Sequence, residues 1–340
     1  DQRQALEHTF YLSNEQKLGS RLSLKYGLRA SAFQNMGEEM VYSYDNDFNK
    51  LDSTLYGSGK IYNTYYGLEP RLGLVWLLPY KSSLKASYSR TIQYIQLGSN
   101  STGGLPFELW FPANANIKPQ SSNQYAVGLF KNLFDNKIET SIEGYYKTID
   151  NLVDFKDNAS LIGNAYIETE ICKGTGRSYG VELLVRKNEG NFTGWLSYTY
   201  SRSLRTVQGI SLGKEYSSPF DRPHNFVAVL SYDVSPRVNF SANWVYNTGQ
   251  PVTYPSGKFM YGNTLIALYS GERNTYRYPD YHRLDFSVTI KGKQNTNLPW
   301  RSEWNFSVYN AYARKNTWAV VFVQDAEHPN TIKTQKVYLF

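Results

Sequence analysis

The chain has 340 residues, of which 19% are charged and 16% aromatic, and its net charge is +7. So many aromatic rings exclude a disordered chain, and no apolar run approaches the roughly 20 residues that a membrane helix needs. The single cysteine, Cys172, excludes a disulfide framework and a cysteine-based zinc site. Because the basic residues form no block, we expect no nucleic-acid partner, and nothing indicates a metal or a cofactor.

Alternation of apolar and polar residues with a period of two predicts strands along almost the whole chain. It is clearest at 236–248, where polar residues that include Arg237, Asn239 and Asn243 occupy every second position. Residues 281–292 repeat the pattern, with Arg283 and Asp285 on the polar face. In chain order, the thirteen predicted strands are 3–13, 19–34, 63–78, 81–96, 120–132, 137–153, 175–187, 191–205, 223–233, 236–248, 281–292, 300–324 and 332–340.

Most of these segments are long enough to cross a bilayer, since a tilted strand needs about 9–11 residues. The sequence therefore predicts an all-β protein, a transmembrane antiparallel β-barrel with almost no helix. Its apolar face would contact lipid and its polar face would line the lumen. The five polar residues named above would then face the lumen or a plug inside it, and Arg283 and Asp285, two positions apart on one face, are expected to pair.

The predicted connections alternate between two lengths. Tight ones at 14–18, 79–80, 133–136, 188–190, 234–235 and 293–299 alternate with long ones at 35–62, 97–119, 154–174, 206–222 and 249–280. Outer-membrane barrels have short periplasmic turns and long extracellular loops. The pattern therefore places the protein in the bacterial outer membrane, in contact with its lipids.

The strand number raises the question of closure. Single-chain bacterial barrels have an even number of strands, and an open sheet edge cannot face lipid. We therefore expect residues 1–340 to be one domain, the C-terminal part of a larger barrel of about 22 strands. The alternative is a complete barrel of about 12–14 strands, a passive porin or fatty-acid-type channel, in which 3–13 would pair with 332–340.

Several short segments, in their order and spacing, resemble the C-terminal barrel half of TonB-dependent outer-membrane receptors, most closely those of the Bacteroidetes type. They are 26–31, 68–74, 84–89, 180–183, 196–201, 218–224, 281–288 and 308–312. The resemblance implies a 22-stranded barrel filled by a plug and energised by the TonB–ExbB–ExbD complex. No plug segment is recognisable in this sequence, so the energising contact would run through a plug outside it.

The resemblance further implies active import of a scarce solute: a siderophore, an oligosaccharide, a peptide or a corrinoid. A lipoprotein partner over the surface loops is compatible with it. No nucleophile is spaced with a base and an orienting group, so we expect no enzyme.

Two long loops carry the candidate solute contacts, because aromatic rings beside cations can stack on a sugar, a peptide or an aromatic chelate and attract negative charge. These candidates are Phe107, Trp110 and Phe111 in the loop 97–119, and Tyr261, Tyr269, Arg273, Tyr276 and Arg277 in the loop 249–280.

Overall fold

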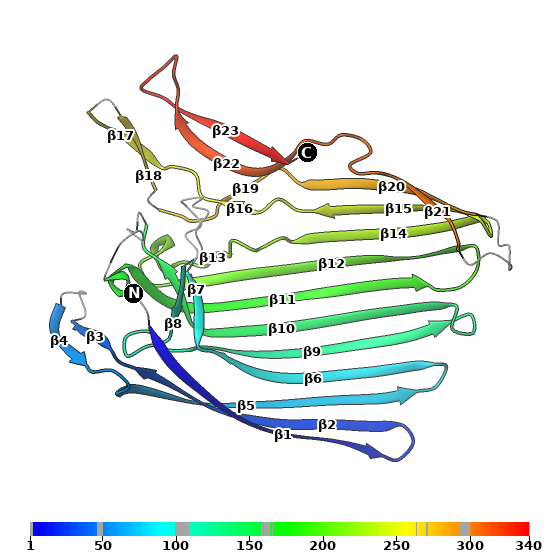
Figure 1. Cartoon of the computed structure of the whole chain (residues 1–340), viewed down its shortest axis with the longest axis horizontal. Helices are drawn as coiled ribbons and strands as arrows, with labels where there is room; N and C mark the ends of the chain where they lie inside the picture. Colours follow the sequence, from blue (N-terminus) through cyan, green and yellow to red (C-terminus); the bar gives the residue numbers. More distant parts are fainter. Residues whose placement is uncertain are drawn as a thin grey trace.

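The centre of the molecule is a 13-stranded antiparallel sheet whose strands lie in the order in which they occur along the chain (Figure 1). The computed structural model describes residues 3–45, 50–98, 109–157, 159, 164, 166–262, 264–269, 271–292 and 300–339. The sheet consists of β1 (Gln4–Leu18), β2 (Leu22–Met36), β5 (Ile61–Leu78), β6 (Ser82–Gln93), β9 (Gln120–Leu133), β10 (Ile138–Phe155), β11 (Ile171–Lys187), β12 (Phe192–Val207), β14 (His224–Ser235), β15 (Val238–Asn247), β20 (Tyr281–Lys291) and β21 (Glu303–Val308), with the short β13 (Tyr216–Ser217) paired to β12.

The sheet has one apolar and one polar face, as the alternation predicts. Phe286 on β20 lies opposite Ala242 of β15 and Val308 of β21, whereas the next residue, Ser287, lies opposite Ser241 of β15. Since side chains alternate across a strand, this register sorts apolar and polar residues onto opposite faces. The large apolar side chains are exposed, Phe286 by 39% and Val308 by 55%, instead of being sealed in a core.

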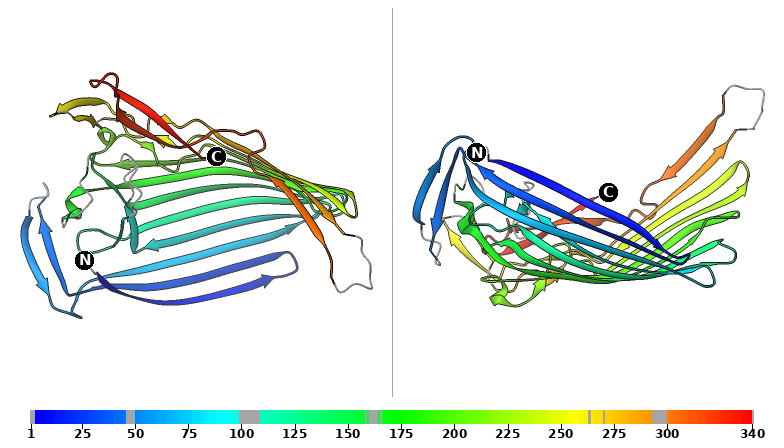
Figure 2. Two further views of the ribbon diagram at one scale, coloured as in Figure 1. Left: turned by 45° about the horizontal axis from the view of Figure 1, so that its top comes forward. Right: turned by 90° about the horizontal axis from the view of Figure 1, so that it is seen from below.

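The sheet is twisted and curved, and it does not close on itself (Figure 2). Within the described ranges, β1 pairs only with β2 and β21 only with β20. The C-terminal strand β23 (Ile332–Leu339) pairs with β22 (Asn316–Gln324) and not with β1. The pairing of 3–13 with 332–340, which the alternative of a complete barrel requires, is therefore not made in the described residues.

The described tight turns lie at one end of the sheet, which we call the short-turn end, and the long connections lie at the other, which we call the long-loop end (Figure 1). The predicted turn 293–299 lies outside the described residues. The long connections contain hairpins that the periodicity does not predict. They are β3 (Glu39–Tyr44) with β4 (Lys50–Tyr56), β7 (Ile95–Gly98) with β8 (Leu109–Pro112), β16 (Pro251–Val252) with β19 (Tyr276–Arg277), and β17 (Gly257–Tyr261) with β18 (Thr264–Leu268).

Three predicted boundaries are wrong. The predicted strand 81–96 ends at Gln93, and its last residues belong to β7, which pairs with β8 in a separate sheet. The segment 300–324 is not one strand: it divides into β21 and β22, because Asn310 takes a positive φ of 53° and its side chain bonds both backbone groups of Arg314, at 3.0 and 2.9 Å. This local turn interrupts the ladder. The residues 14–17, predicted as a turn, continue β1, and the chain reverses after Gly19, whose φ of 73° glycine adopts without strain.

Closed apolar cores occur only where the long connections pack together, within the residues that the structure describes. One cluster contains Phe111, Ile117, Phe155, Ile167 and Ile171, and a second contains Leu152, Cys172, Val207, Ile210 and Tyr216. Two one-turn 3-10 helices, η1 (Ile167–Glu170) and η2 (Ser211–Gly213), lie in the same region. In the described ranges, no helix has the length and apolar character to cross a membrane.

Candidate solute-binding face at the long-loop end

The segment that carries β7 and β8 folds over the polar face of β2 and β5. Asn35 donates to the carbonyl of Ala113 at 2.8 Å, and the hydroxyl of Tyr65 donates to the carbonyl of Asn114 at 2.8 Å. Phe33 stacks on Tyr94 with ring centroids 4.8 Å apart. Because Phe33, Asn35 and Tyr94 are all buried, this long loop is packed onto the sheet at fixed positions.

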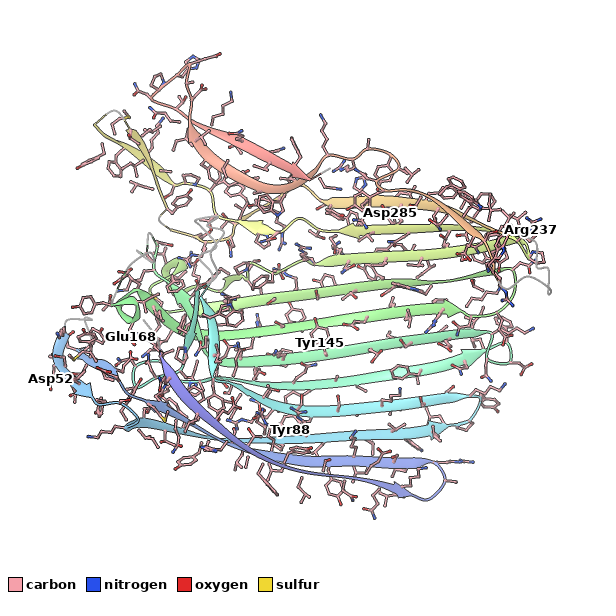
Figure 3. The ribbon with its side chains drawn as sticks, in the orientation of Figure 1. Asp52, Tyr88, Tyr145, Glu168, Arg237 and Asp285 are labelled. Atoms are coloured by element: carbon pink, nitrogen blue, oxygen red, sulfur yellow. The ribbon has the colours of Figure 1, made fainter. Side chains whose placement is uncertain are left out.

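Glu168 of η1 contacts two other parts of the long-loop end, where Figure 3 labels it. Its carboxylate accepts hydrogen bonds from the side-chain amides of Asn114 at 2.7 Å and Asn116 at 3.3 Å, and the guanidinium of Arg3 lies 3.8 Å away. The 3-10 helix η1 is therefore tied to the β7–β8 segment and to the start of β1.

A buried carboxylate, Asp154 at the end of β10, holds two loops to the sheet. Its oxygens contact Arg273 at 3.0 Å and Arg205 at 3.3 Å, and they accept a hydrogen bond from the hydroxyl of Tyr216 at 2.7 Å. Arg273 also pairs with Asp157. Asp154 and Arg273 are 5% and 2% exposed, so the pair is shielded from solvent.

Burial and the same carboxylate set the proton affinities in this cluster. Burial raises the pKa of Tyr216, and the neighbouring charge of Asp154 raises that pKa further, so the phenol stays protonated and donates. Burial alone would lower the pKa of Arg273, but Asp154 and Asp157 outweigh it and raise that pKa above its ordinary value. Both groups therefore keep the charge states that their contacts require.

A second buried carboxylate, Asp221, anchors the other half of the loop 249–280. The backbone amide of Ser203 donates to it at 2.6 Å, and the guanidinium of Arg202 contacts it at 3.3 Å. Arg277 binds both its side chain and, at 2.7 Å, its carbonyl. Asp221 is 1% exposed, so Arg277 fixes β19 against the sheet.

An aromatic cluster, which we call the Tyr254 platform, consists of Tyr254, Tyr269, Tyr276 and Phe322. Tyr254 stacks on Tyr276 at 4.5 Å between centroids and meets Phe322 edge-on at 5.0 Å, while Tyr269 contacts Phe322 at 6.5 Å. Tyr254 and Tyr276 are 38% and 55% exposed. The platform therefore offers open ring faces on loops that Asp154 and Asp221 hold in place.

A family model described as "TonB dependent receptor-like, beta-barrel" matches residues 1–324. The chain belongs to this family of TonB-dependent receptors. It is accordingly an outer-membrane protein, and its family consists of receptors and transporters. No curated protein matches the sequence.

Solved structures of TonB-dependent receptors share the fold. The siderophore receptor PiuA from Acinetobacter baumannii matches with a TM-score of 0.61 and 17% identity over 92% of this chain and 40% of its own. The ferric-catecholate import receptor Fiu from E. coli K12, closed form, has a TM-score of 0.58 and 14% identity over 98% of this chain and 44% of its own. The ferripyoverdine receptor of Pseudomonas aeruginosa has a TM-score of 0.59 and 13% identity over 98% of this chain and 37% of its own. This chain therefore spans less than half the length of these receptors.

The predicted solute contacts fall into two groups, exposed side chains and side chains that are buried or held by an ion pair. Trp110, Tyr261 and Tyr276 are 57%, 74% and 55% exposed, and Tyr269 is partly exposed beside Phe322. Phe111, at 4% exposure, packs in the loop core, and Arg273 is buried on Asp154; Arg277 is bonded to Asp221. Phe107 lies outside the described residues. A direct solute contact stays a prediction for each of the eight.

The predicted lumen residues lie on the polar face. Asn243 is opposite Asp285, and Asn239 donates to Ser231 at 2.7 Å on the same face. The expected pair between Arg283 and Asp285 is confirmed at 2.8 Å. Arg237 lies at the short-turn end and donates to the carbonyl of Lys291 at 2.9 Å, and Asp285 lies further along the sheet (Figure 3). Contact with a plug stays a prediction.

Sequence reasoning missed the two anchoring aspartates. Asp154 comes at the end of a predicted strand and Asp221 in a segment that resembles the family, but nothing local marks either as buried. Their partners are distant, since Arg273 is 119 positions from Asp154. The sequence does mark the partners of these aspartates, since Arg273 and Arg277 are both among the predicted solute contacts, but it assigns them to solute recognition and not to buried ion pairs.

Proposed function

We propose that this chain supplies the wall and the surface loops of an active importer that carries a scarce solute across the outer membrane. The observation that carries the proposal is the inverted burial of the sheet. On interior strands of the sheet, Val127, Leu129 and Ile142 are 52%, 43% and 49% exposed on the apolar face, while Ser141, Glu143 and Lys147 of β10 occupy the opposite face. A wall between lipid and an aqueous lumen requires this distribution.

We propose that residues 1–340 are the C-terminal part of a single barrel domain of about 22 strands. Two findings support this: the edges at β1 and β21 lack a second partner in the described residues, and the chain spans 37–44% of the solved receptors named above. The finer assignment to receptors of the Bacteroidetes type is supported by the resemblance of segments such as 281–288.

For the solute, a ferric siderophore is the first class to test, because the names of the related structures specify ferric-catecholate, siderophore and ferripyoverdine receptors. Oligosaccharides, peptides and corrinoids are the other classes. The exposed rings of Trp110, Tyr261 and Tyr276 would stack on the solute, while Arg273 and Arg277 would fix the loop that presents two of these rings.

Energy would come from the TonB–ExbB–ExbD complex through a plug seated against the polar face, with Arg237, Asn239, Asn243, Arg283 and Asp285 among its contacts. A lipoprotein partner that binds over the surface loops is compatible with this proposal. The proposed role is transport without catalysis.

The test is uptake of a radiolabelled ferric siderophore by cells that produce the full-length protein, in strains with and without TonB. We expect uptake that requires both the protein and TonB. Uptake that persists without TonB would contradict active import and indicate a passive channel. The other solute classes are tested in the same strains.

The loop rings are tested by equilibrium binding of the imported solute. Trp110→Ala and Tyr276→Ala should each weaken binding by up to about tenfold, the value of one stacked ring. Tyr80→Ala is the matched control, because Tyr80 is 88% exposed at the short-turn end. Equal losses in all three variants would contradict the assigned binding face.

A further inference from the structure

The apolar face of the sheet contains a groove that the transport function does not use. Its floor is Gly144 on β10, flanked in register by Val127 of β9 and Val181 of β11. These two valines are 52% and 42% exposed. Because glycine has no side chain, a shallow hollow that is open to the surface, with a volume of about 470 Å³, remains between them.

A row of four tyrosines borders the groove on the side of the long-loop end. Tyr88, Tyr125, Tyr146 and Tyr179 are consecutive register partners on β6, β9, β10 and β11, and Figure 3 labels the first of them. The rings of Tyr88 and Tyr125 are 5.0 Å apart. Tyrosines favour the boundary between hydrocarbon and headgroups, so this row marks that level on the wall.

Two residues beyond the tyrosines, roughly 7 Å along the strands, lie two arginines on the same face. Arg177 is neutralised by Glu215, which it contacts with two hydrogen bonds of 2.8 Å. Arg90, opposite Asn123, is exposed. In the part of the chain that the structure describes, Arg90 has no ion-pair partner. It is thus an uncompensated cation just outside the hydrocarbon boundary.

We propose that this groove binds one acyl chain of an anionic membrane lipid and that Arg90 holds the phosphate of its headgroup. Along the strand direction, the apolar hollow, the tyrosine border and Arg90 follow one another in the order of a lipid molecule: chain, ester region and phosphate. Arg90 lies on β6, two strands or roughly 10 Å to the side of Gly144, an offset that a flexible lipid can span. Arginine binds phosphate with charge-assisted hydrogen bonds. A zwitterionic headgroup has the same phosphate but also carries a cation that repels Arg90, so an anionic headgroup is favoured.

The groove can be filled without disturbing the backbone. A Cβ atom on Gly144 would meet only the carbonyl oxygen of Gly180, at 3.9 Å. Gly144→Leu therefore occupies the hollow, and Gly144→Ala is a milder second variant. Ala30→Leu is the matched control, because Ala30 lies opposite Phe10 and Leu68 on the same apolar face, several strands away.

The charge is tested by Arg90→Gln. Its control is Lys131→Gln, which removes one positive charge from the same face at the short-turn end, where Lys131 lies opposite Ser82. Both side chains are exposed, so neither change affects packing.

The measurement is native mass spectrometry of the full-length protein, delipidated in detergent and titrated with dioleoyl phosphatidylglycerol or dioleoyl phosphatidylcholine. We expect one phosphatidylglycerol to bind several-fold more tightly than phosphatidylcholine, because the choline cation of the second lipid opposes Arg90. Arg90→Gln should abolish this preference and Lys131→Gln should keep it. Gly144→Leu should reduce binding of both lipids at least tenfold, Gly144→Ala should reduce it less, and Ala30→Leu should leave it unchanged.

Unchanged lipid binding in Gly144→Leu, or a loss in Ala30→Leu equal to that in Gly144→Leu, would overturn the proposal that the groove binds the lipid. Equal binding of the two lipids by the wild-type protein, or equal effects of the Arg90 and Lys131 variants, would overturn the role of Arg90. Solute uptake is measured in a separate experiment. A negative uptake result would therefore contradict the import proposal without changing the lipid-binding results.

Discussion

Replacement of Arg273 by methionine tests whether a buried ion pair holds the receptor's largest loop. Methionine keeps the apolar stem and removes the guanidinium that binds Asp154 at 3.0 Å and the carbonyl of Phe155 at 2.9 Å. Asp154 then stays buried with Arg205 and Tyr216 as its remaining partners.

The size of the effect follows from burial. Removing one partner of a buried pair costs about 3–5 kcal/mol, because the other charge is left desolvated. Arg273 is 2% exposed and Asp154 5%, but Asp154 keeps Arg205 as an ionic partner, so the lower end of this range applies to the free energy of opening the loop 249–280. At 1.4 kcal/mol for each factor of ten, the open population should rise about a hundredfold.

Hydrogen–deuterium exchange measures this population at the loop amides. The amide of Asn274 donates to Thr253 at 3.0 Å and that of Tyr278 to the carbonyl of Gln250 at 2.9 Å, so both report on opening. The control is Lys214→Met. Lys214 contacts Glu272 at 3.2 Å and joins the same two loops, but with side chains 65% and 55% exposed.

An exposed pair contributes about 1 kcal/mol or less, so Lys214→Met should change exchange by less than about fivefold. Similar exchange in the two variants would refute the conclusion that burial on Asp154, and not charge alone, anchors the loop.

Three further predictions concern the wall, the loop core and pH. Phe286→Arg should destabilise the barrel by about 2–4 kcal/mol in urea titration in vesicles, whereas Ser287→Arg, on the polar face, should not; equal effects would contradict the two-faced wall. Phe111→Ala should open the core of the β7–β8 loop by about 3–5 kcal/mol, seen as faster exchange at residues 109–117, and unchanged exchange would refute its packing role. The pKa of Tyr216 is raised in the folded protein, so its stabilising effect is complete below the unfolded value of about 10 and is lost as the pH rises above that value. Proteolysis of the loop 208–223 should therefore increase above pH 10 and show a smaller increase in Tyr216→Phe; the same increase in both proteins would argue against this phenol.

The strands of the wall were predictable because each carries its own signal. A period of two over ten or more residues identifies β15 and β20 without knowledge of their neighbours, and it also places Arg283 and Asp285 on one face. The prediction failed at 300–324, where the side chain of Asn310 turns the chain. An asparagine inside an aromatic run does not by itself show that its side chain will bond the backbone four residues on.

The solute-binding face was only partly predictable. Exposed rings such as Trp110 and Tyr276 and buried groups such as Phe111 and Arg273 belong to the same loops and have the same composition. Which of them is buried depends on partners more than a hundred positions away, since Asp154 and Arg273 meet only after the sheet has formed.

The sequence by itself determined the local alternation, hence the strands, their two faces and the sorting of turns and loops, because a strand's side-chain direction is fixed by its backbone. Only the tertiary structure decided the open edges, the folding of the β7–β8 loop onto the polar face, and the capture of Arg273 and Arg277 by buried aspartates. Those features depend on which distant charges share a low-dielectric environment, and no local pattern encodes that.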